Sequence, residues 1–460
     1  MRTIRFGTFL AAIGILLMCF SSGFSEAAIM VWKQSGGSVG ASRIIMQVNS
    51  VQGNDGASGF SNAEANKLIE AWQRKASYKM QAEVPVQAGK RSEAVQIAGI
   101  GGDYTDFTTL WLSEGSMITK RSMSEDSNIV VLSEGLAERL FGSTDVVGME
   151  ITILNKKFQI IGVYRKDNHL LEWMTTGTKP EVLLPAGVLS ELLPELRVGT
   201  IELQASDAIL SGERDVQVVL QANKLPLDGY TIQIGDHKMR LMEQLPRLLP
   251  SLAGLLVIGL SLLLMRKLLL LIFWRFRSAL QMGYASDAWR QESGFIWTRA
   301  IACMGLAVMV VILWPYTRYS FYIPSEMIPE RWIDLHFFKS KLFEFWREKP
   351  VLAEQAFQFQ LMESRLRSFV PLLTVMGILL GLPLFLMGIR EWRLAGLSKQ
   401  GQMTTLFYCM ATSYAFTNFT LILAGMPQVV QPGLWITIFG FCIIAAIYNS
   451  PKRKDVRYET

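Results

Sequence analysis

The chain has 460 residues, of which 50% are hydrophobic and only 18% are charged. Soluble globular domains rarely combine so much apolar surface with so little charge, so the composition predicts side chains that face lipid. The formal net charge is +6, but the basic residues are dispersed or gather at the ends of apolar runs instead of forming one stripe. This distribution argues against a nucleic-acid partner and is typical of membrane topology signals.

Six apolar runs each approach the roughly 20 residues that a helix needs to cross the hydrocarbon core of a bilayer. The runs lie at residues 6–31, 248–273, 298–315, 369–389, 404–425 and 433–449. A long polar segment separates the first two of them. The pattern predicts an α+β extracytoplasmic domain inserted in an all-α transmembrane helix bundle of about six spans.

We divide the chain into five regions on this basis. They are an N-terminal transmembrane anchor (1–32), the extracytoplasmic α+β domain (33–245), transmembrane helices 2 and 3 with a cytoplasmic connector (246–315), an extracytoplasmic amphipathic loop (316–366), and transmembrane helices 4 to 6 with a basic cytoplasmic tail (367–460).

Basic groups beside the apolar runs predict the orientation. Because Lys and Arg concentrate on the cytoplasmic side, one arrangement places both termini in the cytoplasm and residues 33–245 outside a plasma membrane. The groups are Arg2 with Arg5, Arg266 with Lys267, Arg275, Arg277 and Arg290, then Arg390, Arg393 and Lys399, and finally Lys452, Arg453, Lys454 and Arg457.

The first apolar run has two interpretations. Met1–Arg5 is basic, Phe6–Phe20 is apolar and Ser25–Ala28 is a small-residue stretch, an order that also describes a cleaved signal peptide. Apolar character resumes at Ala27–Trp32 and gives the run the length of a span. We therefore favour a retained anchor.

The extracytoplasmic segment alternates β-rich runs with helical patches. Helices are predicted over Asn62–Lys75 and Ser133–Phe141, with Gly142 as a terminator, and a hairpin turn is predicted at Asn155–Lys157. None of the four cysteines lies in this segment, so a packed core must hold it without disulfides. Strands are predicted at Arg43–Val48, Lys79–Val86, Ala94–Ala98, Asn128–Leu132, Glu150–Leu154, Phe158–Val163 and Thr200–Leu203.

The second apolar run is short before its first charges. Leu248–Met265 would form about 27 Å of helix before Arg266 and Lys267, which is barely enough for one crossing. We predict that Leu268–Trp274 continues the same helix along the membrane surface or into the cytoplasm. The aromatic and charged loop 316–366 suits either a helix in the membrane interface, which we favour, or a surface that docks the extracytoplasmic domain.

The sequence carries no recognisable catalytic or metal-binding motif. The three histidines, His169, His237 and His336, have no second ligand or base at motif spacing, and no paired-cysteine zinc signature occurs. Gly99–Asp103 begins like a dinucleotide fingerprint but lacks its third glycine, so we interpret it as a turn-forming stretch. No GxxxxGK[ST] phosphate loop occurs either. We predict no catalytic residue, no cofactor and no metal.

A family resemblance covers residues 96–163. The ordered segments are Gln96–Tyr104, Leu112–Ser116, Ile129–Gly142, Asp145–Ile151 and Phe158–Val163. Together they resemble the extracytoplasmic core domain of MacB/FtsX-type ABC transporter permeases. The resemblance implies a permease-like, non-catalytic subunit that works in membrane lipid with a separate P-loop ATPase subunit and a second permease subunit, as a homo- or heterodimer.

A second, weaker resemblance lies in the cytoplasmic connector. Arg277–Ser286 is similar to the family element in which a basic residue precedes Leu-Gly-Ala-Ser and contacts the nucleotide-binding subunit. Met282 and Tyr284 replace the residues that are usual in the family, so a generic amphipathic connector stays an alternative. The number of spans differs too, because the family has four spans and this chain is predicted to have about six. The resemblance implies an ATPase contact at Arg277, Leu280, Gly283, Tyr284, Trp289 and Arg290.

Two functions follow from these observations. The first is a subunit of an ABC-type mechanotransmission or export complex. The alternative is a membrane-anchored extracytoplasmic sensor or scaffold that has lost ATPase coupling, and an extracytoplasmic enzyme is a disfavoured third class. A neighbouring gene for a P-loop ATPase would favour the first function over the second.

Overall fold

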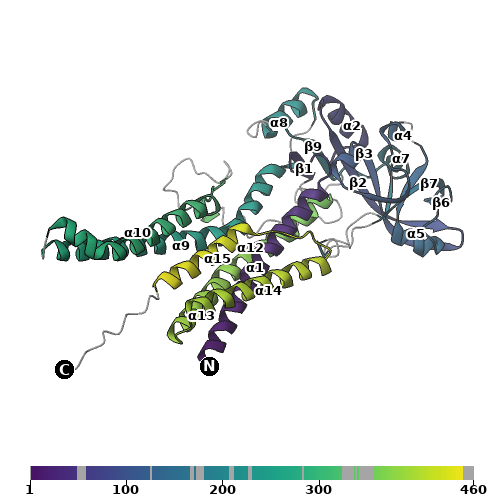
Figure 1. Cartoon of the computed structure of the whole chain (residues 1–460). Coiled ribbons are helices and arrows are strands. Elements are labelled where there is room, and N and C mark those ends of the chain that lie inside the picture. The colour runs from purple at the N-terminus through teal and green to yellow at the C-terminus, as the bar shows by residue number, and fades with distance from the viewer. Residues whose placement is uncertain are drawn as a thin grey trace.

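A computed structural model gives the structure of the chain. It describes residues 2–48, 59–124, 127–165, 170–171, 181–206, 212–225, 230–281, 284–323, 336, 339–340 and 357–448. Figure 1 shows a mixed α/β domain at one end of the molecule and a bundle of long helices at the other. The predicted fold class is thereby confirmed.

The α/β domain is built on one sheet, whose strands follow the order β10-β1-β9-β2-β3-β8-β5-β7-β4, while β6 pairs with β2 and β7. Most pairs are antiparallel, but β3 with β8 and β5 with β7 are parallel. All seven predicted strands are present, and β4, β8 and β10 are additional. The strands are β1 (Arg43–Val48), β2 (Ala76–Ala88), β3 (Arg91–Gly102), β4 (Trp111–Gly115), β5 (Ile129–Ser133), β6 (Glu150–Ile153), β7 (Lys156–Arg165), β8 (Val182–Pro185), β9 (Thr200–Gln204) and β10 (Tyr230–Ile234).

Short helices accompany the sheet: α2 (Asn62–Ala71), α3 (Tyr104–Phe107), α4 (Lys120–Ser124), α5 (Glu134–Phe141), α7 (Ala186–Leu192) and α8 (Gly212–Ala222). The predicted caps of α5 are confirmed, because Ser133 Oγ accepts a hydrogen bond from the Leu136 amide and Gly142 is left-handed at φ +77°. Leu136 and Leu140 are buried in the main core, whereas Phe141 packs at its edge and is only half-buried.

The stretch Gly99–Asp103 was expected to be a turn, and this prediction is wrong for its first four residues, Gly99–Gly102. These residues complete β3, and only Gly102 is left-handed, at φ +72°. A Cβ atom at Gly99 would come 2.9 Å from the Leu189 side chain, and one at Gly101 would clash with the Tyr78 ring. The glycines therefore serve close packing across the strand.

Two boundaries in the domain also differ from the prediction. The β6–β7 hairpin turns at Leu154 and Asn155, both with positive φ, so Lys156 already belongs to β7. Two consecutive left-handed residues match the twist of antiparallel strands, which moves the turn one residue earlier than composition suggests. The helix predicted over Asn62–Lys75 ends at Ala71.

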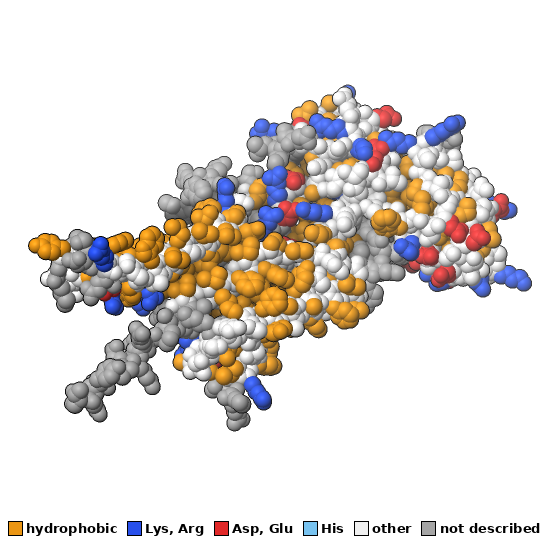
Figure 2. Space-filling view, viewed as in Figure 1, with side chains coloured by type: hydrophobic (Ala, Val, Ile, Leu, Met, Phe, Trp, Pro, Cys, Tyr) orange, Lys and Arg blue, Asp and Glu red, His pale blue; other side chains and the backbone are white. Residues whose placement is uncertain are grey.

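Six helical segments make up the bundle, and each predicted apolar run falls in one of them over its described residues. Five are long and apolar enough to cross a membrane, while α15 is apolar but shorter. Figure 2 shows hydrophobic side chains covering the bundle and charged ones gathered over the α/β domain. The helices are α1 (Arg2–Ser35), α9 (Gly235–Leu280), α10 (Ala285–Thr317), α12 (Gln358–Met376) joined through the π-helical turn η3 (Gly377–Gly381) to α13 (Leu382–Leu394), α14 (Lys399–Leu423) and α15 (Pro432–Tyr448).

Helix α9 is continuous over 46 residues. The prediction that Leu268–Trp274 extends the second span as one helix is confirmed. After Gln281 the chain reverses into α10, and the two helices form an antiparallel hairpin in which Arg275 pairs with Glu292 at 3.0 Å. We call α9 and α10 the hairpin; its far end projects beyond the other helices in Figure 1.

Helix α1 packs closely against α13 through small residues. A Cβ atom at Gly388 would come 2.6 Å from the Ala11 amide nitrogen, and one at Gly14 would clash with the Phe385 backbone. Trp392 is buried nearby and donates to Thr8 Oγ1 at 3.1 Å. Close backbone approach of this kind is how helices associate in lipid, where burial from water supplies no driving force.

Candidate functional site

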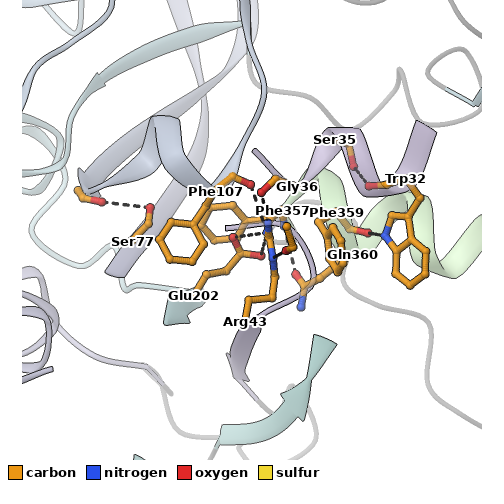
Figure 3. Close-up of polar contacts among 12 residues, drawn as sticks. Trp32, Ser35, Gly36, Arg43, Ser77, Phe107, Glu202, Phe357, Phe359 and Gln360 are labelled. Atoms are coloured by element: carbon orange, nitrogen blue, oxygen red, sulfur yellow. Dashed lines mark hydrogen bonds and ion pairs between the residues drawn. The ribbon is translucent and has the colours of Figure 1, made fainter. Parts of the chain in front are cut away.

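Three membrane helices meet the sheet at one place. Helix α1 ends at Ser35, just before β1 begins at Arg43, and β10 ends at Ile234, where α9 begins at the next residue. Helix α12 begins there too, at Gln358. Figure 3 shows the side chains that converge. We call Gly36, Arg43, Phe107, Glu202 and Phe359 the junction.

Arg43 is the centre of the junction and is fully buried. Its Nη1 donates to both carboxylate oxygens of Glu202, at 3.0 and 2.9 Å, and to the Phe107 carbonyl at 3.2 Å. Nε donates to the Gly40 carbonyl at 2.6 Å, and Nη2 donates to the Gly36 carbonyl. One side chain thus ties the end of α1 to β1, β9 and α3.

Arg43 and Lys79 are both buried cations, and each lies against an aromatic ring. The Arg43 guanidinium carbon lies 4.2 Å from the Phe359 ring centroid, and Lys79 Nζ lies 5.0 Å from that of Phe357. Burial raises the pKa of the Glu202 carboxyl, and the adjacent Arg43 opposes that shift. A buried ion pair is tolerated only when its remaining hydrogen-bonding groups have partners. For Arg43 these partners are the carbonyls of Gly36 and Phe107.

The start of α12 contacts both the sheet and α1. Phe357 is buried in a cluster with Ala98 and Ile100 of β3 and with Tyr104 of α3, and the rings of Phe357 and Tyr104 have centroids 5.9 Å apart. The Phe359 carbonyl accepts a hydrogen bond from Trp32 Nε1 at 2.9 Å, and their rings lie 4.8 Å apart. Phe357 and Phe359 belong to the predicted loop region 316–366 and touch the domain, as the docking alternative expects.

Ion pairs join the same helices around the junction. Lys33 of α1 pairs with Glu243 of α9, and Lys238 of α9 pairs with Glu363 of α12 at 2.6 Å. Glu363 is buried, so the second pair is shielded from solvent and from screening by salt. The three helices that reach the sheet are therefore also fixed to one another.

A separate contact reaches the last two helices. The Leu170 amide, in the connection after β7, donates to the Ala424 carbonyl at the end of α14 at 2.9 Å. Leu171 is buried in a cluster that includes Met426 and Val429 of the α14–α15 loop. This loop therefore lies on the side of the bundle that faces the α/β domain.

The predicted ATPase-contact residues lie at the far end of the hairpin. Tyr284 is 83% exposed and Trp289 is 46% exposed. The Trp289 ring meets the Phe276 ring edge-on at 6.4 Å, which fixes its direction without burying it. The structure brings together Arg277, Leu280, Tyr284, Trp289 and Arg290 at this tip, all exposed, while Gly283 lies outside the described residues.

The described residues show no constellation for metal chemistry. No group of three or more His, Cys, Asp or Glu residues among them could hold a metal ion. All four cysteines are free and buried. What the geometry offers is a closely packed connection between the bundle and the α/β domain, and an exposed tip at the far end of the hairpin.

Known proteins resemble parts of this chain. Residues 9–217 match the family described as the MacB-like periplasmic core domain. The macrolide export ATP-binding/permease protein MacB of Neisseria gonorrhoeae is 30% identical over 71 residues, which are 15% of this chain and 11% of that protein. The pyoverdine export ATP-binding/permease protein PvdT of Pseudomonas aeruginosa is 38% identical over 69 residues, 14% of this chain and 10% of that protein. The chain thus matches only about a tenth of the length of these curated relatives.

Part of the chain is also similar to a solved structure. The periplasmic region of MacB from Actinobacillus actinomycetemcomitans has 18% sequence identity and a TM-score of 0.36, with 44% of this chain and 92% of that chain covered.

Proposed function

We propose that the chain is a permease-like, non-catalytic subunit of an ABC-type mechanotransmission or export complex, because residues 9–217 match the MacB-like periplasmic core domain and shorter stretches are similar to ATP-binding/permease proteins. Its partners in this proposal are a second permease subunit and an ATPase. The relatives are named ATP-binding/permease proteins, whereas these 460 residues contain no phosphate loop, so the proposal assigns ATP hydrolysis to a separate subunit.

The junction is the observation that carries the proposal. A mechanical transmitter needs a stiff connection between the membrane helices and the domain they move. Here β10 continues into α9 without a loop, and Arg43 ties the end of α1 to two strands through a buried ion pair in which Nη1 donates to both carboxylate oxygens of Glu202. A displacement of α1, α9 or α12 would therefore carry the sheet with it.

The orientation is part of the proposal. The α14–α15 loop lies toward the α/β domain, whereas the start of α1 lies beside the end of α13, since a Cβ atom at Gly7 would come 2.9 Å from that of Glu391. The basic groups at the start of α1 and at the end of α13 therefore lie on the side away from the domain. The positive-inside rule puts that side in the cytoplasm and the domain outside a plasma membrane.

The hairpin tip supplies the ATPase contact in this scheme. Tyr284 and Trp289 are large aromatic side chains, the type that anchors protein interfaces, and the exposed Arg277 and Arg290 flank them. The tip lies at the cytoplasmic end of α9, and α9 leads without a break to the sheet. One helix thus joins the proposed input to the junction.

Copurification from the native membrane in mild detergent tests the proposal. A P-loop ATPase should accompany the intact chain, and Trp289→Ala or Tyr284→Ala should release it while membrane insertion stays intact. Trp111→Ala is the matched control, because Trp111 is equally exposed but lies on β4 of the α/β domain. If no ATPase accompanies the unmutated chain, the sensor or scaffold alternative replaces the transporter function.

A further inference from the structure

The hairpin carries a ring of basic residues well before its tip. Arg266 and Lys267 lie on α9, and Arg299 lies on α10. The pairing of Arg275 with Glu292 sets the register of the two antiparallel helices. This register brings the three basic residues to the same height along the hairpin, within about one helical turn. We call Arg266, Lys267 and Arg299 the collar.

The collar marks one edge of an apolar slab. The uncharged stretches Leu248–Met265 of α9 and Ala300–Thr317 of α10 both end at it, and each forms about 27 Å of helix, close to the thickness of a bilayer's hydrocarbon core. Past the collar both helices continue, to Leu280 in α9 and from Ala285 in α10, which adds roughly 20 Å.

The part of the hairpin past the collar is unusually apolar for a helix pair in water. A water-facing helix normally shows one polar face, but here exposed apolar side chains occupy successive positions of α9. Aromatic rings are prominent among them, as is typical of the membrane interface. The exposed apolar side chains are Leu269, Leu270, Leu271, Phe273, Trp274 and Trp297.

The same segment is strongly positive. Residues 265–301 contain six basic and two acidic residues, and one of the acidic residues, Glu292, is engaged by Arg275. Apolar and aromatic side chains next to basic residues match a surface in which an apolar layer lies beside a layer of negative charge. An anionic phospholipid leaflet has this character, because its headgroup phosphates lie at the edge of the hydrocarbon.

We propose that the collar binds anionic phospholipid headgroups and that the apolar side chains just past it lie in the headgroup interface of the leaflet. Figure 1 shows the far end of the hairpin projecting beyond the other helices, which leaves it open to lipid. Figure 2 shows exposed hydrophobic and basic side chains at that end of the molecule. The inference does not rest on an ATPase or on the orientation, because the proposed ATPase contact lies at the tip and the lipid site at the collar.

The test is lipid binding by the purified full-length chain alone. Native mass spectrometry in detergent would compare retention of phosphatidylglycerol with that of phosphatidylcholine as each lipid is titrated. The wild-type chain should prefer phosphatidylglycerol, and the R266Q/K267Q/R299Q variant should lose that preference by roughly tenfold or more, since each basic residue near an anionic surface contributes on the order of fivefold in affinity.

The matched control is K67Q/K90Q/K224Q, which removes the same charge from exposed lysines of the α/β domain. It should keep the wild-type preference. Equal binding of the two lipids by the wild-type chain, or equal loss in the collar and control variants, would overturn the proposal. An unchanged preference in the collar variant would also overturn it.

A second measurement needs no variant. Raising the salt concentration from about 0.05 to 0.5 M shortens the screening length severalfold. The preference of the wild-type chain for phosphatidylglycerol should then shrink, while binding of phosphatidylcholine should change little. A preference that does not respond to salt would show that the headgroup charge is not recognised. Capture of an acidic protein in place of lipid would identify the other kind of occupant and equally refute the proposal.

Discussion

The junction and the hairpin differ in whether their charged side chains are buried or exposed. At the junction Arg43 and Glu202 are fully buried, and the carbonyls of Gly36, Gly40 and Phe107 satisfy the guanidinium. Along the hairpin most basic side chains are exposed, and large apolar side chains beside them are about half exposed.

This difference suggests a division of roles. Burying an ion pair costs desolvation energy, so a fold that retains one gains a fixed geometry more than it gains stability. The junction holds the sheet in one position relative to α1, α9 and α12, while the hairpin is left available for lipid and a partner.

The largest effect is expected at Arg43. Arg43→Ala would leave the Glu202 carboxylate buried without a partner, which costs roughly 3 to 5 kcal/mol of unfolding free energy. Arg266→Ala on the hairpin should cost almost nothing, because its side chain is exposed. Thermal unfolding in detergent measures both variants. Similar losses at the two positions would refute the contrast between the regions.

The two tryptophans give a second comparison. Trp392 is 1% exposed and packs between α13 and α1, so Trp392→Ala should lower stability by about 3 kcal/mol or more. Trp297 is 60% exposed on the hairpin, and Trp297→Ala should leave the unfolding temperature in detergent nearly unchanged. A large loss at Trp297 would mean that the hairpin is packed against something within the fold.

Glycine substitutions give a smaller contrast. Gly388→Ala places a methyl group 2.6 Å from the Ala11 backbone, and such overpacking typically costs about 1 to 3 kcal/mol. Gly259→Ala on α9 is the control, since nothing lies within 4 Å of a Cβ atom there. The control should be neutral or slightly stabilising, as alanine favours helix over glycine. Equal tolerance at both sites would argue against close packing of α1 on α13.

The smallest effect concerns a surface contact beside the junction. Hydrogen bonds from Lys75 Nζ at 2.8 Å and Ser38 Oγ at 2.6 Å hold the pKa of Asp106 below its usual value. The contact therefore stabilises the folded protein at pH values above the usual aspartate pKa. This stabilisation is lost as the pH falls through the lowered pKa of Asp106. Asp106→Asn should cost roughly 0.5 kcal/mol at neutral pH, and the difference from wild type should vanish in strong acid. A pH-independent difference would assign the effect to packing.

Much of this architecture follows from local sequence pattern. Alternation and β-branched residues predict β1, β2 and β7, and length with hydropathy predicts the membrane helices. The four-residue strand β8 is buried throughout, and β4 is exposed throughout. Neither strand therefore shows the alternation of apolar and polar residues that marks a half-buried strand.

The junction could not be predicted in the same way. Arg43 and Glu202 are 159 residues apart, and no periodicity links them. The one usable signal is a carboxylate inside the otherwise apolar predicted strand Thr200–Leu203, because a buried acid requires a partner. The ATPase contact at the hairpin tip rests on family resemblance alone and remains a prediction.

The central claim is that movement of the membrane helices reaches the α/β domain through the junction. The most direct test is the distance between spin labels at Lys90→Cys in the domain and Gly294→Cys on the hairpin, measured in the complex with its ATPase, with and without ATP. The unmodified junction should give a distance change on ATP binding. R43M/E202M, which replaces the buried pair with apolar side chains, should lose that change while ATP hydrolysis continues, and K156Q/E191Q, which removes an exposed ion pair, should keep it. An equal distance change without the Arg43–Glu202 pair, or none in the wild-type complex, would contradict the account.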